Sequence, residues 1–161
     1  MNQALKIAPA GHWHIADSAL RHADTEADRL ACFAVMHELR PHLRDADEFM
    51  QRTGRAREQG YRILAAWEQG AVVALAGYRF QENLVYGPFL YVDDLVAAST
   101  QRGKRWGERL LAALEGVAAE AGCARLVLDT GMANALAQRF YFRQGMLTGA
   151  LRFGKAIGAA A

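Results

Sequence analysis

The spacing of apolar residues along the first third of the chain predicts helices. In residues 25–39, Leu30, Phe33 and His37 recur at helical spacing, and Pro41 ends the predicted helix. Residues 46–58 carry a few apolar side chains among many charges, which indicates a second helix at the surface. Before both of them, residues 12–16 alternate in a way that predicts a short strand.

The period then changes to two, which is the spacing of strands. Residues 61–67 and 71–80 predict two antiparallel neighbours, because the three residues between them, 68–70, end in glycine and have the length of a hairpin loop. A polar turn at 81–83 leads into a third long strand at 87–97.

The second half of the chain alternates strands and helices. A helix with a continuous apolar face ends at Gly122, a short buried strand follows at 126–130, a helix at 134–144 and a last strand at 146–153. The apolar face consists of Leu110, Leu111, Leu114, Val117, Ala118 and Ala121. The order of elements predicts a mixed α/β (α+β) sheet with a crossover in its second half.

Composition limits the classes of protein to consider. The 161 residues are 52% hydrophobic, enough for one core, so we expect a single domain over residues 1–161. Lys and Arg number 19 against 17 Asp and Glu, and a formal charge of +2 indicates neither a nucleic-acid binder nor an acidic tail. The apolar runs are far shorter than the roughly 20 residues that span a bilayer. Without a leader-like start, and with two cysteines at no metal-type spacing, we expect a reduced, cytoplasmic protein.

A basic, glycine-containing segment lies between the third long strand and the helix with the continuous apolar face. The first amides of a helix have no intrahelical partner and, with the helix dipole, favour an anion. Gly103 and Gly107 would let a ligand approach the backbone, while Arg102, Lys104 and Arg105 add cations. Bare solvation is the alternative for these side chains, but cations here oppose the helix dipole. The segment therefore predicts pyrophosphate binding, although it is neither a Walker loop nor a Rossmann fingerprint.

Two motifs resemble the GCN5-related N-acetyltransferase (GNAT) superfamily. The signature [QR]xxGx[GA] is similar to the run from Arg102 to Gly107, with one departure: Arg105 stands where the family has its first glycine. The second motif, NxxAxxFYxxxG followed by an apolar residue, is matched in full. Its residues here are Asn134, Ala137, Phe140, Tyr141, Gly145 and Met146. The resemblance covers residues 61–153 well, and the first 60 residues by element order alone.

The resemblance implies a fold, a co-substrate and a set of binding residues. The fold would be a mostly antiparallel sheet of six to seven strands flanked by about four helices. Acetyl-CoA would be bound with its pyrophosphate on the amides of residues 102–107. Its pantetheine arm would lie along the backbone of Leu95, Val96 and Ala97, where two strands splay apart. The residues expected at the pyrophosphate are Arg102, Gly103, Lys104, Arg105, Trp106 and Gly107. Many such folds pair as dimers, so a homodimer is one option, although no interface is legible in the sequence.

Two residues of the second motif have both a functional and a structural interpretation. By the resemblance, Tyr141 would protonate the departing thiolate, and its structural alternative is a packed aromatic beside Phe140. Asn134 would cap the last helix and, by the resemblance, would also bond the pantetheine arm.

Three acids are candidates for the base that takes a proton from the acceptor amine. Asp93 and Asp94 are adjacent in a strand, where side chains alternate, so both reach one cleft only if a bulge intervenes. Carboxylates in an apolar strand need hydrogen-bond or ion-pair partners. Nearby arginines or backbone amides could be those partners, in which case the two acids would have a structural role only. Asp129 follows the next strand and, by the resemblance, stands where relatives acting on protein N-termini have an acid; its alternative is a turn cap.

Other reactive residue types indicate no further chemistry. All five histidines lie in the first 42 residues, with no carboxylate or cysteine spaced to complete a metal site, so we expect none. Cys32 and Cys123 are typical of inert core residues. Tyr91 lies on the strand face of Asp93 and could line an acceptor site.

These observations predict an acetyl-CoA-dependent N-acetyltransferase that transfers the acetyl group directly to a primary amine in a ternary complex. The acceptor would be a small-molecule amine or a protein N-terminus, with neither nucleic acid nor membrane as partner. A non-catalytic acyl-CoA-binding or regulatory module of the same fold is the alternative. Near-neutrality would then reflect cancellation between a basic donor site and an acidic acceptor site.

Overall fold

The computed structural model describes residues 13–158, which form two compact parts. The first ends at Leu128 and the second begins at Asp129. Among the described residues, no helix is both long enough and apolar enough to span a membrane.

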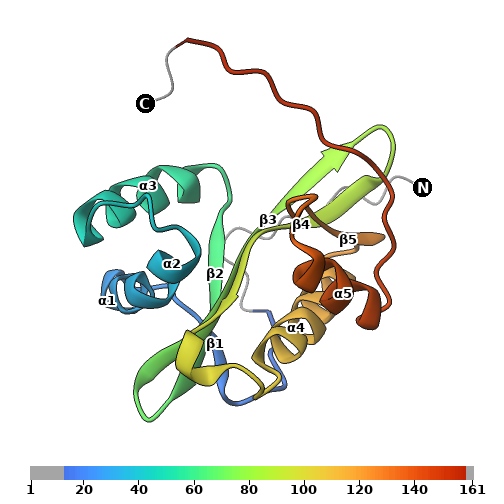
Figure 1. The fold of residues 1–161 in the computed structure, drawn as a ribbon. Coiled ribbons are helices and arrows are strands. Elements are labelled where there is room, and N and C mark those ends of the chain that lie inside the picture. The colour runs from blue at the N-terminus through green and yellow to red at the C-terminus, as the bar shows by residue number, and fades with distance from the viewer. Residues whose placement is uncertain (1–12, 159–161) are drawn as a thin grey trace. The chain divides into compact units, whose positions relative to one another are not determined.

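The first part is built on one twisted sheet of five strands in sequence order (Figure 1). The strands are β1 (Leu20–His22), β2 (Arg62–Glu68), β3 (Ala71–Asn83), β4 (Gly87–Ala97) and β5 (Arg125–Leu128). Neighbours from β1 to β4 are antiparallel, and β5 is parallel to β4. A parallel pair needs a crossover, and the helix α4 (Trp106–Glu120) supplies it.

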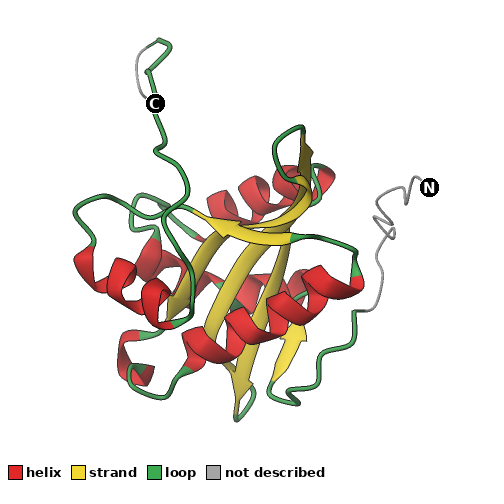
Figure 2. Cartoon of the chain, turned by 90° about the vertical axis from the view of Figure 1, so that its right-hand side faces the viewer, coloured by secondary structure: helices red, strands yellow, loops and turns green. Residues whose placement is uncertain are grey.

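Helices cover both faces of this sheet (Figures 1 and 2). One face carries α1 (Glu26–Ala31), α2 (Phe33–Leu39) and α3 (Ala46–Glu58), and the other carries α4. Thr25 and Asp45 cap α1 and α3, their side chains accepting hydrogen bonds from the amides of Asp28 and Glu48. A short 3-10 turn, η1 (Ser99–Gln101), joins β4 to the segment before α4.

Alternating strand residues divide the core into two layers. Leu64, Tyr78 and Leu90 pack on the α4 side, whereas Ile63 and Leu75 pack on the side of α1 to α3. The predicted period of two is confirmed by this division, because consecutive residues of β2 enter opposite layers. The predicted apolar face of α4 is confirmed as well, since its leucines are buried.

Two local predictions in this part are wrong. The strand predicted at residues 12–16 does not form: residues 13–17 are not in a strand, and His12 lies outside the described residues. The first strand is β1, which pairs with the middle of β2. The predicted turn at 81–83 belongs to β3, and the chain reverses at 84–86 instead. Asn83 ends β3 because its side-chain oxygen accepts from the amides of Val85 and Tyr86, which makes an Asx turn.

The second part contains α5 (Ala135–Arg143) and an extended segment after it. Residues 146–153 form no strand, contrary to the sequence prediction, because no neighbouring strand among the described residues supplies ladder hydrogen bonds. Leu147, Leu151 and Phe153 are exposed there. The described chain therefore has five strands rather than six or seven, and five α-helices rather than about four.

Candidate functional site

The segment before α4 combines two positive φ angles with a helix start that no side chain caps. Gly103 and Arg105 have φ angles of 84° and 61°, so the chain turns twice through the left-handed region before α4 begins at Trp106. Arg105 is the N-cap, and no side chain caps the helix. The amides of the first turn, including Gly107, are therefore left without a side-chain partner at the positive end of the helix dipole.

The departure of the sequence from the family signature has a conformational meaning. Glycine is favoured where φ is positive, and Arg105 adopts such a φ without being glycine. Its guanidinium makes two hydrogen bonds to Glu108, of 2.8 and 2.5 Å. Arg105 thus reproduces the turn that a glycine would make.

The cations of the loop are exposed, and two of them already have carboxylate partners. Lys104 Nζ lies 3.2 Å from Glu68 Oε2, and Arg105 is paired with Glu108. Arg102 is exposed at the end of the 3-10 turn. The backbone amides are therefore open to a ligand, whereas Lys104 and Arg105 would have to exchange partners to bind one.

A buried tryptophan and an ion pair fix the start of α4 within the first part. Trp106 is buried, and the Arg109 guanidinium lies 4.0 Å from the centroid of its ring. Arg109 also donates to both carboxylate oxygens of Asp17, at 2.7 and 2.8 Å. These hydrogen bonds from Arg109 are the main cause that lowers the pKa of Asp17.

The backbone of β4 loses its β5 partner where the family resemblance places pantetheine. Pairing between β4 and β5 ends at Val92 and Leu128, while β4 continues to Ala97. On that side of β4, the peptide groups around Leu95, Val96 and Ala97 have no strand partner among residues 13–158. These peptide groups can therefore bond a ligand that runs along the strand.

A β-bulge at Asp93 brings both adjacent acids to one face of the sheet. Tyr78 pairs with Val92 and Gly77 pairs with Asp94, so Asp93 is the extra residue of β4. The Asp93 carboxylate oxygen Oδ2 lies 2.9 Å from Arg79 Nε. The Arg79 guanidinium in turn lies 5.6 Å from the centroid of the Tyr61 ring. Asp94 accepts a hydrogen bond from the hydroxyl of the same tyrosine, Tyr61. The bulge required for both acids to share a cleft is present.

The two acids have different surroundings. Asp94 is bonded at both oxygens: Arg40 lies 2.8 Å from Oδ1, and Tyr61 donates to Oδ2 at 2.8 Å. Asp93 has one guanidinium partner, and burial raises its pKa despite the opposing effect of Arg79. Asp94 therefore has partners at both carboxylate oxygens, whereas the side chain of Asp93 is held by one ion pair. Tyr91 lies opposite Arg79 in the β3–β4 register and is half-buried.

The remaining candidates belong to the second part. Asn134 caps α5 as predicted, its side-chain oxygen accepting from the amide of Ala137 at 3.1 Å. The Tyr141 ring packs edge-on against Phe140 with centroids 5.4 Å apart, and burial raises the pKa of its phenol. Asp129 is exposed and forms an ion pair with Arg152.

The histidine and cysteine side chains that the structure describes gather at no metal site. Within residues 13–158, no group of three or more His, Cys, Asp and Glu side chains could hold a metal ion. Burial raises the pKa of the Cys32 thiol to about 12, which keeps it protonated and unreactive. Cys123 is half-buried, and burial raises its pKa too.

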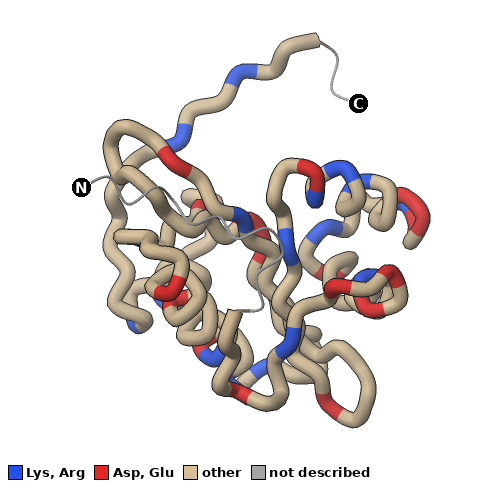
Figure 3. The backbone as a smooth tube through the Cα atoms, turned by 180° about the vertical axis from the view of Figure 1, so that it is seen from behind, with Lys and Arg blue, Asp and Glu red and all other residues tan. Residues whose placement is uncertain are grey.

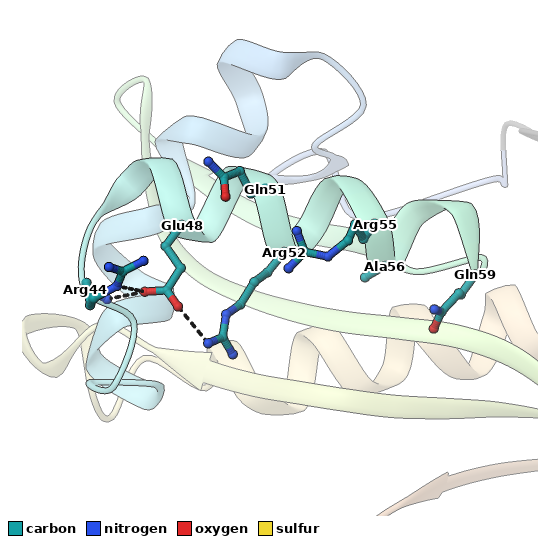
Figure 4. Close-up of a pocket in the computed structure, with 7 residues that line it drawn as sticks. All are labelled: Arg44, Glu48, Gln51, Arg52, Arg55, Ala56 and Gln59. Atoms are coloured by element: carbon teal, nitrogen blue, oxygen red, sulfur yellow. Dashed lines mark hydrogen bonds and ion pairs between the residues drawn. The ribbon is translucent and has the colours of Figure 1, made fainter. Parts of the chain in front are cut away.

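A surface hollow of about 430 Å³ on α3 contains none of the predicted site residues (Figure 4). In it, Glu48 lies between Arg44 and Arg52, at 3.0 and 2.7 Å. Hydrogen bonds lower the pKa of Glu48 to about 2, and the bond from the Arg44 amide has the largest effect. Charges of both signs follow α3 (Figure 3), as expected for a solvated helix face.

Sequence reasoning missed the partners of the acids. Arg40, Tyr61 and Arg79 come from three different elements, and only the fold brings them to the bulge. Two signals were present in the sequence. Arg79 interrupts an apolar strand, and Gly77 lies inside a strand, where glycine often marks a close approach of other groups.

Comparisons with known proteins show which family the chain matches. The sequence profile of the Acetyltransferase (GNAT) family matches residues 15–146. Aminoalkylphosphonate N-acetyltransferase of Salmonella typhimurium is 32% identical over 142 residues, covering 86% of this chain and 90% of that protein. The uncharacterized N-acetyltransferase YhdJ of Bacillus subtilis is 31% identical over 110 residues, covering 68% and 77%.

A solved structure agrees at the level of the fold. The aminoglycoside N-acetyltransferase AAC(6')-Iy, in complex with CoA, superposes with a TM-score of 0.74 at 16% identity, covering 85% of this chain and 93% of that one. Together with the profile match, which spans most of the chain, these likenesses identify the protein as a member of the GNAT family of acetyltransferases.

Proposed function

We propose that this protein is an acetyl-CoA-dependent N-acetyltransferase that acts on a small primary amine. One observation carries the proposal: the edge of β4 that has no strand partner within residues 13–158 leads, through η1 and residues 102–105, to the uncapped N-terminus of α4. A ligand with an amide-rich arm and a pyrophosphate has the chemistry to use both. Acetyl-CoA is such a ligand.

The donor would be held mainly by backbone groups. The pantetheine arm would bond the free peptide groups of Leu95, Val96 and Ala97, and the pyrophosphate would take the amides of residues 102–107. Asn134 uses its side-chain oxygen for the helix cap, so its amide nitrogen is available as a donor to the pantetheine arm.

Transfer would be direct. The neutral amine attacks the thioester carbonyl carbon, a C–N bond forms, the C–S bond breaks, and the electron pair leaves on sulfur. An alkylamine with a pKa of about 10.4 must first lose a proton, for which Asp93, acting directly or through water, is the proposed acceptor. Tyr141 would give a proton to the thiolate, and its phenolate would take up, through water, the second proton that the nitrogen loses as the amide forms. Before transfer, its raised pKa keeps the phenol protonated at neutral pH. Neither cysteine is proposed to carry an acyl group.

The acceptor is proposed to be a small amine because a relative with 32% identity over most of both chains is named for aminoalkylphosphonates. Protein N-termini remain the other acceptor class, since Asp129 resembles the acid of relatives acting on them. A non-catalytic acyl-CoA-binding module is favoured by one observation: Asp93 and Asp94 already have arginine partners without any substrate.

The deciding experiment is an acceptor screen with release of CoA as readout. The panel contains 2-aminoethylphosphonate, simple alkylamines, aminoglycosides, amino acids and peptides with free N-termini. Wild type is compared with alanine variants of Asp93, Asp94 and Asp129 and with Tyr141→Phe. We expect turnover on a small amine, lost with Asp93→Ala and slowed with Tyr141→Phe. Acetyl-CoA binding without turnover on any acceptor would favour the non-catalytic module.

A further inference from the structure

The C-terminal end of α2 is tied to the bulge of β4 by one side chain. Arg40, the C-cap of α2, places Nε and Nη2 at 2.9 and 2.8 Å from Asp94 Oδ1. Its Nη2 also donates to the backbone carbonyl of Asp93 at 3.0 Å. A single guanidinium thus holds the side chain of one acid and the main chain of the other, which is the residue that bulges.

The opposite side of Asp94 is closed by a tyrosine and a glycine. Tyr61 donates its hydroxyl to Asp94 Oδ2 at 2.8 Å, and Gly77 faces Asp94 across the β3–β4 ladder. A Cβ on Gly77 would lie 2.0 Å from the Tyr61 hydroxyl oxygen and 2.7 Å from Asp94 Oδ2. Arg40, Tyr61 and the close approach of Gly77 therefore hold the Asp94 carboxylate in one position.

Asp93 is the less constrained partner of this cluster. Arg79 Nε reaches its Oδ2 at 2.9 Å, and the described residues supply no hydrogen bond to its Oδ1. The charged or titratable groups around it are Arg79 from β3, Asp94 from β4, Arg40 from the end of α2 and Tyr61 from just before β2. Its carboxylate is therefore set by the backbone of the bulge and by one ion pair.

We propose that Arg40 is a positioning residue for acetyl transfer: by holding Asp94 and the carbonyl oxygen of Asp93, it fixes the bulge that presents the Asp93 carboxylate to the acceptor amine. This inference rests on the proposed function. It gives α2 a part in the reaction without contact to the reacting atoms.

Removing the guanidinium has two physical consequences. The half-buried Asp94 carboxylate loses its cation, and an unpaired charge at such a site is costly. The negative charge of Asp94 is then no longer compensated, and Asp93 also loses the nearby positive charge of Arg40. Both changes favour the protonated form of Asp93. The bulge also loses the bond to its carbonyl oxygen, so both the geometry and the acidity of Asp93 change.

The test compares Arg40→Gln and Arg40→Lys with Arg44→Gln as matched control. Arg44 lies four residues further on, is exposed, and pairs with Glu48 rather than with β4. Acetyl-CoA and 2-aminoethylphosphonate are the probes, replaced by the fastest acceptor of the screen if that differs. Readouts are kcat, KM for acetyl-CoA, the pH profile of kcat, and hydrogen exchange at the amides of Asp94 and Leu95.

For Arg40→Gln we expect kcat to fall about 10- to 100-fold with KM for acetyl-CoA unchanged, because a misplaced catalytic group costs rate rather than donor affinity. The acidic limb of the profile moves to higher pH, and exchange at Asp94 and Leu95 becomes faster. Arg40→Lys keeps the charge and returns the acidic limb towards that of wild type, while Arg44→Gln leaves every readout as in wild type. Tyr61→Phe, a smaller change, is expected to move the same readouts less.

One result would overturn the inference alone, and another would overturn it together with the proposed function. Unchanged exchange and an unchanged acidic limb in Arg40→Gln, with wild type active, would reject the positioning role alone. A wild type that turns over no acceptor rejects the proposed function, and the positioning role with it, even if exchange at Asp94 shows that Arg40 holds the bulge.

Discussion

At the scale of single residues, Gly77 shows how closely the acid cluster is packed. We expect Gly77→Ala to destabilise the protein by about 1–3 kcal/mol, because the new methyl group would overlap the Tyr61 hydroxyl and ring. Tyr61 is buried and cannot move aside without breaking its bond to Asp94. Denaturant unfolding measures the change.

The matched control for that substitution is Gly54→Ala in α3. No atom lies within 4 Å of a Cβ at Gly54, and its φ is not positive. Alanine is favoured over glycine in a helix by roughly 0.5–1 kcal/mol, so this variant should be more stable than wild type. Equal effects of the two substitutions would mean that the contacts of Gly77 do not constrain the cluster.

Arg105 provides the second test at this scale. Replacing it by glycine or alanine removes the same ion pair to Glu108, but only alanine keeps a Cβ in the left-handed region. We therefore expect the glycine variant to be more stable than the alanine variant by about 1 kcal/mol, the reverse of the usual order in helices. The same pair of substitutions at exposed Glu115 within α4 should give the usual order. If the alanine variant at position 105 were as stable as the glycine variant, or more stable, the positive φ of residue 105 would not be a source of strain.

At the scale of elements, the cap of α5 separates structure from ligand binding. Asn134→Ala removes the acceptor for the Ala137 amide, so the first turn should fray and that amide should exchange faster, by about 1 kcal/mol of local stability. Asn134→Asp keeps an accepting oxygen and should preserve protection. If the amide nitrogen bonds pantetheine as proposed, both variants weaken acetyl-CoA binding. Weakening in the alanine variant alone would make Asn134 only a cap.

Element prediction succeeded where local pattern decides the outcome. The helix at 46–58 and the strand at 87–97 have the bounds expected from the sequence, because caps and periodicity lie within each segment. The predicted last strand at 146–153 does not form, since a strand depends on a neighbour that its own residues cannot supply. The predicted helix at 25–39 forms but is divided at Cys32.

The candidate site shows the same division between local and long-range information. The N-cap Asn134 follows from nearby residues, whereas the sequence predicts no positive φ at Arg105. The sequence shows that both acids reach one cleft only if a bulge is present, but it does not predict the bulge at Asp93, because a register shift depends on the partner strand. Arg40 lies 54 residues from Asp94 along the chain, so no local pattern relates them.

At the scale of the whole molecule, the charge balance is local. The sequence suggested that a basic donor site cancels an acidic acceptor site. The structure instead pairs Lys104 and Arg105 with their own carboxylates, and Asp93 and Asp94 with arginines. Exposed pairs of this kind contribute little to stability, and they also reduce the free positive charge at the loop. Pyrophosphate binding would therefore depend mainly on the amides at the start of α4.

That dependence can be tested with two ligands that share the acetylated arm. At 100 times its Kd, acetyl-CoA should stabilise the folded protein by about 2.7 kcal/mol, which corresponds to a rise in Tm of about 5–10 °C for a chain of this size. S-acetylpantetheine has the same thioester arm but no pyrophosphate. At equal concentration we expect it to raise Tm much less, because it leaves the amides of the first turn of α4 unbonded. Differential scanning fluorimetry of wild type with each ligand makes the comparison. Equal shifts would place the binding energy in the pantetheine arm and exclude the loop as a pyrophosphate site, whereas no shift with saturating acetyl-CoA would remove the proposed donor altogether.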